Sequence, residues 1–183
     1  MSVIRVAKGA GLSLVCAVLF GCGFSLRGQA TLPPEMESTY IEWPASPHYE
    51  LKLRLEQALH NAGVVVMTDP EIATATLRIT KAEVGERVLS VSAMNRPAEY
   101  LVFVRVTFDL HSDGRVLFPE ETQALAQDYS FDPTAVLSKM REGKIIELAL
   151  IDDMVAQILR RLEAAGQITP GPATSETGAA LLQ

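Results

Sequence analysis

The chain has 183 residues, of which 48% are apolar, 16 are basic and 22 are acidic, giving a formal net charge of −6. This length and apolar content suit a single domain with a hydrophobic core and a further segment at each end. The acidic balance argues against nucleic acid as a partner, because nucleic-acid binding depends on a cationic surface.

The first 21 residues have the layout of a secretory signal peptide. Two basic residues precede a mostly apolar run from Gly9 to Phe20, and the small residue Gly21 stands before Cys22. A helix that spans a bilayer needs about 20 apolar residues, so the shorter run favours a signal peptide at 1–21 that is removed. A retained transmembrane segment is the alternative.

Cys22 is the predicted lipidation site. The stretch from Leu19 to Cys22 resembles a bacterial lipobox, in which the cysteine becomes the acylated N-terminus. Cys16 is the one other cysteine in the sequence, and it would leave with the signal peptide, so we expect no disulfide. A disulfide between the two would require the signal to stay. Stable anchoring needs more than one acyl chain, and the lipoproteins that this stretch resembles carry three.

Removal of the signal peptide would take away two basic residues and leave 14 against 22 acidic ones, a net charge of about −8. Gly23 follows the cysteine, in place of the Asp that commonly retains such lipoproteins in the inner membrane. We therefore expect a protein that is anchored to the outer membrane and faces the periplasm.

The first part of the mature chain predicts a tether, a strand and a helix. Residues 22–34 end in two prolines and are expected to be irregular. Thr39–Trp43 is rich in β-forming residues and predicts a first strand. Ser46 and the proline after it are typical of a helix N-cap and first helical position. Apolar residues then recur at helical spacing until Gly63, which predicts an amphipathic helix of about four turns.

Three more strands are predicted in the middle of the chain. The alternating pattern of Ala75–Val84 indicates a half-buried strand, and residues 89–97 are expected to form a long hairpin connection. Alternation is clearest from Tyr100 to Leu110, where the even-numbered residues are aromatic or aliphatic. An Asp-Gly turn then predicts a hairpin that returns through Val116–Phe131.

A long second helix is predicted from Asp132 and Pro133, which repeat the cap-then-proline pattern, to Gly166. Its apolar stripe is expected to cover about eight turns and to consist of Leu137, Met140, Leu148, Ile151, Val155, Ile158 and Leu162. The segment 167–183 is rich in Pro, Gly, Ser, Thr and Ala, and it predicts a disordered tail.

These elements predict an α+β fold, a two-layer sandwich formed by residues 35–166. Two helices with one apolar stripe each would pack on one face of a mainly antiparallel sheet of about four strands. The opposite, more polar face of the sheet would remain free for a partner.

The sequence contains no constellation typical of an enzyme or a metal site. The three histidines lie in different predicted elements without cysteine or carboxylate ligands at metal-site spacing. A Gly-rich phosphate loop and a Gly-x-Ser-x-Gly elbow are both missing from the sequence. Asp152 and Asp153 would point about 100° apart on a helix, which disfavours an acid/base pair. We therefore predict a binding protein that is not an enzyme and uses no metal or cofactor.

Basic residues gather in two places on this acidic chain. Between Leu77 and Arg105 they outnumber the acidic residues, and they are Arg78, Lys81, Arg87, Arg96 and Arg105. A second cluster in the first turns of the long helix consists of Lys139, Arg141 and Lys144. Solvated surface charge explains each residue taken alone. Together the clusters indicate an anionic ligand, because Arg and Lys form charge-assisted hydrogen bonds with phosphate.

Four stretches of this sequence occur in the order and at the spacing found in the LptE family of lipopolysaccharide-assembly lipoproteins. They are Cys22–Gly28, Ala98–Tyr100 at the start of the long strand, Asp128–Asp132 and Leu137–Lys139. The chain resembles this family over roughly Cys22 to Leu162.

The resemblance implies a lipoprotein that plugs the lumen of the outer-membrane β-barrel LptD, assists the assembly of that barrel, and binds lipopolysaccharide on its way to the cell surface. A compact domain with a polar exterior suits the polar lumen of a barrel. The phosphates of lipopolysaccharide would account for cationic clusters on an acidic protein.

The resemblance also implies lipopolysaccharide contacts from basic residues in the hairpin before the long strand and early in the second helix. Lys139 matches the second place. Ala93 or Met94 stands in the first, where Arg96 and Arg87 are the nearest basic residues. Together with Arg78 from the same cationic region, the candidate lipopolysaccharide-binding residues are Lys139, Arg96, Arg87 and Arg78.

Two other functions are compatible with the sequence. A periplasm-facing lipoprotein that binds another amphiphile or scaffolds an envelope complex would have the same signal peptide and charge pattern. For an envelope hydrolase, the predicted compartment is the only feature of the sequence that offers support. Co-purification of a barrel protein would favour the LptD partnership over the first, and hydrolysis of an envelope substrate would favour the second.

Overall fold

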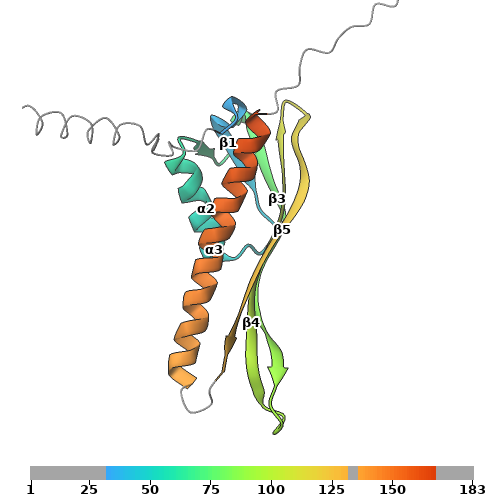
Figure 1. Ribbon diagram of the computed structural model, residues 1–183. Helices are drawn as coiled ribbons and strands as arrows, with labels where there is room; N and C mark the ends of the chain where they lie inside the picture. Colours follow the sequence, from blue (N-terminus) through green and yellow to red (C-terminus); the bar gives the residue numbers. More distant parts are fainter. Residues whose placement is uncertain (1–31, 132–135, 168–183) are drawn as a thin grey trace, which may run out of the picture.

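The computed structural model describes residues 32–131 and 136–167. The predicted signal peptide, the tether before Leu32, the predicted start of the second helix at Asp132 and Pro133, and the tail after Gln167 lie outside the described residues. The described part is elongated, with two helices on one side of a long, twisted sheet (Figure 1).

The sheet has five strands in the order β2-β1-β3-β4-β5 and is mixed. The prediction of a mainly antiparallel sheet of about four strands was therefore wrong in strand number and, for the β1 pairings, in strand direction, whereas the α+β class with two helices on one face of the sheet is confirmed. The additional strand is β2 (Val65–Met67), which pairs in parallel with β1 (Ser38–Glu42). Three residues are too few to show an alternation in the sequence, so no strand was predicted there.

Two long hairpins form the rest of the sheet. β3 (Ala75–Val91) pairs in parallel with β1 and antiparallel with β4 (Pro97–Ser112), which pairs antiparallel with β5 (Arg115–Ser130). The long connection predicted over residues 89–97 was wrong, because β3 continues to Val91 and β4 begins at Pro97. The β3–β4 hairpin therefore projects beyond the rest of the sheet (Figure 1).

The β4–β5 turn follows the predicted Asp-Gly pattern. Asp113 and Gly114 have φ angles of 49° and 72°, the left-handed values that a type I′ turn needs at both central positions. The alternation predicted for β4 is confirmed as well, because its residues from Val102 to Leu110 with even numbers are all buried.

Helix α2 (Tyr49–Asn61) buries Leu51, Leu55 and Leu59, which stand four residues apart on one face. It begins later than predicted, because His48 and not Ser46 is the N-cap residue. Gly63 adopts a φ of 91° just after the helix, as the sequence predicted. Two short 3-10 helices, η1 (Pro34–Met36) and η2 (Pro70–Ile72), lead into β1 and β3.

Helix α3 (Val136–Gln167) packs along the sheet beside α2, and Arg54 of α2 forms an ion pair with Asp152 of α3. The predicted stripe is confirmed in its second half, where Ile151, Val155, Ile158 and Leu162 are buried. It was wrong at the start, because Leu137 and Met140 are exposed. The stripe continues instead through Ile146, Leu150 and Met154.

The core lies between the two helices and the inner face of the sheet. Its fully buried large side chains are Met36, Leu51, Leu55, Leu59, Leu77, Ile79, Phe108, Leu110, Ile151, Met154, Ile158 and Leu162. They come from η1, from both α-helices and from β3 and β4, so the core occupies the half of the molecule that α2 covers. Only α3 continues over the sheet toward the projecting hairpin (Figure 1).

Candidate functional site

The tip of the β3–β4 hairpin and the start of α3 lie at the same end of the molecule (Figure 1). We call residues 86–99 and 136–145 together the distal end. Thirteen large hydrophobic side chains of the described residues are exposed, and eight of them belong to the distal end. They are Val88, Leu89, Val91, Met94, Val136, Leu137, Met140 and Ile145. Met94 is 81% exposed and Leu137 is 76% exposed. A concentration of this kind marks a contact surface for an apolar ligand or partner.

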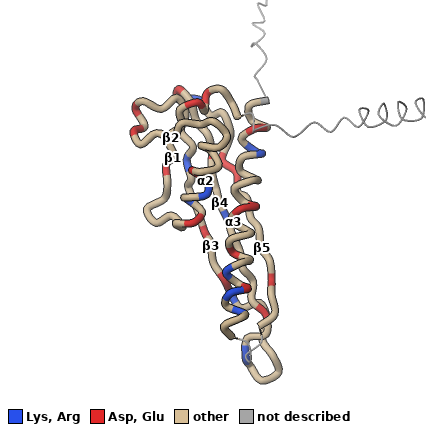
Figure 2. Tube along the Cα trace, turned by 90° about the vertical axis from the view of Figure 1, so that its left-hand side faces the viewer, with Lys and Arg blue, Asp and Glu red and all other residues tan. Residues whose placement is uncertain are grey.

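The distal end is also cationic. It carries five basic residues, Arg87, Arg96, Lys139, Arg141 and Lys144, against three glutamates, whereas the whole chain has a net charge of −6. Figure 2 shows basic positions along the lower part of α3 and at the hairpin tip. Cations next to exposed apolar side chains suit a ligand with anionic groups and hydrocarbon chains.

Local ion pairs hold two of these cations. Lys139 Nζ lies 2.7 Å from Glu142 Oε2, and Lys144 Nζ lies 2.7 Å from Glu147 Oε1. Both pairs span three residues of α3, so they offset the unfavourable placement of cations near a helix N-terminus. The guanidinium of Arg87 lies 5.9 Å from the centroid of the Phe103 ring. Among the described residues, Arg96 and Arg141 form no ion pair.

An aromatic cluster fixes the distal end to the rest of the fold. Tyr129 at the end of β5 is 7% exposed, and its hydroxyl donates a hydrogen bond to Glu86 Oε1 at 3.1 Å. The Tyr100 ring stacks on Tyr129 at 5.8 Å and meets Phe131 edge to face at 5.4 Å. Gly143 of α3 lies so close that a Cβ there would be 2.9 Å from the Tyr129 hydroxyl oxygen. The helix, the projecting hairpin and β5 therefore meet at Tyr129.

Tyr129 gives a pH-dependent stability. Its burial, helped by the hydrogen bond and charge of Glu86, raises its pKa from 10.0 to about 12. The neutral phenol is favoured in the folded state, so the stabilisation is complete below the unfolded pKa of 10.0 and is lost as pH rises from there through about 12. We expect the urea concentration at the unfolding midpoint to decrease as the pH is raised from 9 to 12. The fall should be smaller in Tyr129→Phe, and equal falls in both proteins would contradict this role.

The four cationic candidates do not lie together. Lys139, Arg96 and Arg87 belong to the distal end, which also carries eight of the exposed apolar side chains. Arg78 lies in β3 beside β1, opposite Asp109 of β4 and thirteen residues before the end of the strand. Cys22 lies outside the described residues. The apolar part of this surface was not predicted, because the spacing of Leu137 and Met140 favours a core stripe, whereas both side chains are exposed.

Arg78 is engaged by a buried carboxylate. Its Nε and Nη2 atoms donate hydrogen bonds to Asp109 at 3.2 and 2.5 Å, and the Asp109 side chain is 3% exposed. The hydrogen bond and charge of Asp109 raise the pKa of Arg78. His111 Nε2 lies 2.9 Å from Asp109 Oδ1 on the other side. Arg78 therefore compensates a charge within the fold, in addition to any ligand contact.

No helix in the described ranges is both long enough and apolar enough to cross a membrane. In the same ranges, no three residues of the His, Cys, Asp and Glu types come together as a metal site would require. His48 and His111 are half-buried and His60 is exposed; His48 caps the start of α2, His60 lies in its last turn, and His111 lies in β4.

Residues 36–162 match the model of the family described as LptE, lipopolysaccharide-assembly. The LPS-assembly lipoprotein LptE of Yersinia enterocolitica is 26% identical over 152 residues, which is 82% of this chain and 72% of that protein. The protein of the same name from Yersinia pestis is 24% identical over the same shares.

Solved structures of bacterial lipoproteins share the fold. Uncharacterized lipoprotein B of Nitrosomonas europaea superposes with a TM-score of 0.67 and 28% identity, over 80% of this chain and 94% of that one. A minor lipoprotein of Acinetobacter baumannii has a TM-score of 0.56 and 22% identity, over 70% and 92% of the two chains. Because the family match covers more than half of the sequence, the chain belongs to the LptE family of lipopolysaccharide-assembly lipoproteins, which is not an enzyme family.

Proposed function

We propose that the chain is an outer-membrane lipoprotein, anchored through acyl chains on Cys22, that plugs the LptD barrel, assists its assembly and binds lipopolysaccharide through the distal end. The observation that carries the lipopolysaccharide proposal is the chemistry of the distal end, where five cations lie among eight exposed apolar side chains. Lipopolysaccharide combines phosphates with hydrocarbon chains, so both halves of this surface have a counterpart in the ligand.

The family membership and the shape of the domain support the barrel partnership. The Yersinia relatives carry the name of LPS-assembly lipoproteins. The described domain is narrow and elongated (Figure 1). The ion pairs of Lys81 and Arg105 with Glu83 place exposed charge on the outer face of its sheet. A plug of this kind suits a barrel interior, which is lined by polar side chains.

Lys139 and Arg96 are the residues that we expect to matter most for lipopolysaccharide binding. The double substitution Lys139→Glu and Arg96→Glu should weaken the binding of purified lipopolysaccharide by about tenfold to a hundredfold, a loss of about 1.4–2.7 kcal/mol. Each change replaces a partly solvent-exposed ionic contact, worth up to about 1 kcal/mol, by repulsion of similar size. Binding is measured on immobilised lipopolysaccharide at fixed ionic strength. Circular dichroism checks that the variant is folded.

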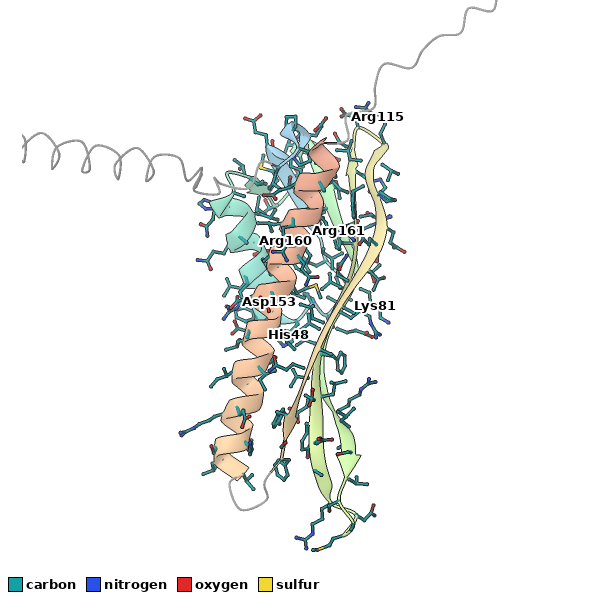
Figure 3. The ribbon with its side chains drawn as sticks, in the orientation of Figure 1. His48, Lys81, Arg115, Asp153, Arg160 and Arg161 are labelled. Atoms are coloured by element: carbon teal, nitrogen blue, oxygen red, sulfur yellow. The ribbon has the colours of Figure 1, made fainter. Side chains whose placement is uncertain are left out.

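A matched pair of substitutions at the opposite end provides the control. Arg115 in the β4–β5 turn and Arg160 on α3 lie away from the hairpin tip (Figure 3). Arg115→Glu with Arg160→Glu changes the net charge by the same amount and should leave binding near the wild-type value. Equal weakening by both double variants would mean that net charge, and not the distal end, governs the affinity.

The barrel partnership has its own test, an affinity pull-down of the tagged protein from detergent-solubilised membranes with mass spectrometry of the bound proteins and of the N-terminal peptide. A stoichiometric large barrel and a triacylated Cys22 would support the proposal. An acylated Cys22 without a barrel would favour a periplasm-facing lipoprotein that binds another amphiphile or scaffolds an envelope complex.

A further inference from the structure

β5 is a long strand with one free edge. It stands at the end of the strand order and, within the described ranges, pairs with β4 alone. Of its sixteen residues only Tyr129 is buried, whereas β4 buries most of its second half. An edge strand presents a row of backbone N–H and C=O groups that can pair with another strand.

The two halves of this edge differ. The first half contains Pro119, two adjacent glutamates and a register shift against β4, which are the features by which proteins protect an edge from pairing. The stretch that follows, Thr122–Gln127, contains neither proline nor charge, and Asp128 comes directly after it. The six residues from Thr122 to Gln127 therefore form an unprotected edge segment.

Hollows flank the unprotected segment on both faces of the sheet. On the outer face, a hollow of about 370 Å³ is lined by Leu101, Phe103, Ala124 and Ala126 together with neighbouring charged residues. On the inner face, a groove of about 490 Å³ is lined by Gln127 of β5 and by residues of α3, among them Arg141 and Ile145. Successive side chains of an added strand would enter these two spaces in turn, because strand side chains alternate between faces.

Acidic residues stand at both ends of the segment on the outer face. Asp128 lies opposite Leu101, and the Glu120 carboxylate accepts a hydrogen bond from the Thr80 hydroxyl at 3.1 Å. Thr122, Ala124 and Ala126 occupy the outer-face positions between them. A complementary strand would carry a basic residue at each end, eight positions apart, with uncharged residues between.

We infer that β5, from Glu120 to Asp128, binds an extended segment of another protein by strand addition, and that this segment has small or apolar side chains between two terminal basic residues. The free edge and the acidic ends lie on these nine residues, and the same residues form part of the lining of both hollows. The inference goes beyond the proposed function and does not depend on lipopolysaccharide binding.

A second copy of the chain fits this edge poorly. Pairing two β5 strands antiparallel about Ala124 would align the uncharged segments but place Glu120 directly opposite Asp128 at both ends. Like charges directly opposite destabilise a strand pair. The charge pattern therefore favours a partner of different sequence over self-association.

The peptide Lys-Thr-Val-Thr-Val-Thr-Val-Thr-Lys has the required spacing and tests the inference on the folded protein. At low ionic strength it should slow hydrogen exchange of alternate amides within Thr122–Gln127, because every second N–H of an edge strand points outward. A peptide with Glu in place of both Lys should bind about tenfold more weakly, a difference of about 1.4 kcal/mol.

Charge reversal supplies the decisive comparison. In the variant Glu120→Lys with Asp128→Lys, which keeps the backbone edge intact, the preference should reverse in favour of the Glu-ended peptide. Equal binding of both peptides to both proteins, protection that falls outside β5, or the absence of protection in a protein with native circular dichroism would each overturn the inference.

Discussion

Replacing Phe108 with alanine is expected to lower the free energy of unfolding by about 3–5 kcal/mol, because the change removes a large buried ring and leaves a cavity that the surrounding sheet cannot fill. Phe108 is fully buried, its ring stacks on Phe118 at 5.5 Å with an interplanar angle of 12°, and it pairs with Ile79 and Glu121 on the two neighbouring strands. Urea unfolding followed by circular dichroism measures the loss.

Phe103 on the opposite face of the same strand is the matched control. It is only partly buried, and it contacts Gly85 and Arg87 instead of the core. Phe103→Ala removes a ring of the same size from a surface that water can reach, so its cost should be less than half of that for Phe108→Ala. Similar losses in the two variants would contradict the assignment of the core to the inner face.

Replacing Gly143 with leucine should also destabilise the protein, by about 2 kcal/mol net, although leucine is the better helix former. A Cβ at this position would lie 2.9 Å from the hydroxyl oxygen of Tyr129, closer than real Cβ atoms approach, and 3.2 Å from its Cζ, which is also a tight contact. Tyr129 is buried and bonded to Glu86, so it cannot move aside without loss of its own contacts. The helix or β5 must shift instead.

Ala149→Leu provides the comparison for Gly143→Leu in the same helix. Ala149 is exposed, so leucine there should change stability by about 0.5 kcal/mol or less. The Gly143 variant should in addition lose the stability change between pH 10 and pH 12 that belongs to Tyr129. Retention of that change together with wild-type stability would show that α3 does not pack on Tyr129 in solution.

Patterns with a clear period were predictable from the sequence, and structure set by close contacts was not. The alternation from Tyr100 to Leu110 predicted β4 correctly, because one face of that strand is buried throughout. The extension of β3 beyond Val84 was missed because Gly85 and Glu86 resemble the end of a strand. Gly85 instead accommodates the Phe103 ring, whose Cζ would lie 3.1 Å from an added Cβ.

At the start of α3, the helical spacing of the apolar residues was recognised correctly, but these residues were wrongly assigned to the core. Leu137 and Met140 have the spacing of a core stripe, but the inner-face stripe runs through Ile146 and Gly143, and a glycine does not register in an apolar pattern. The same error concealed the site, because apolar side chains assigned to the core could not be counted as surface. The basic residues were found because charge alone identifies them.

The parallel pairing of β1 also constrains the order in which the chain can fold as it is synthesised. β1 is made first, yet its pairing on one side needs Ala75–Arg78 of β3, some 36 residues later. The ion pair between Arg54 of α2 and Asp152 of α3 joins residues that are 98 positions apart in sequence. The β3–β4–β5 hairpins involve shorter loops and can close sooner. We therefore expect β1 to dock last, after the β3–β4–β5 hairpins have formed.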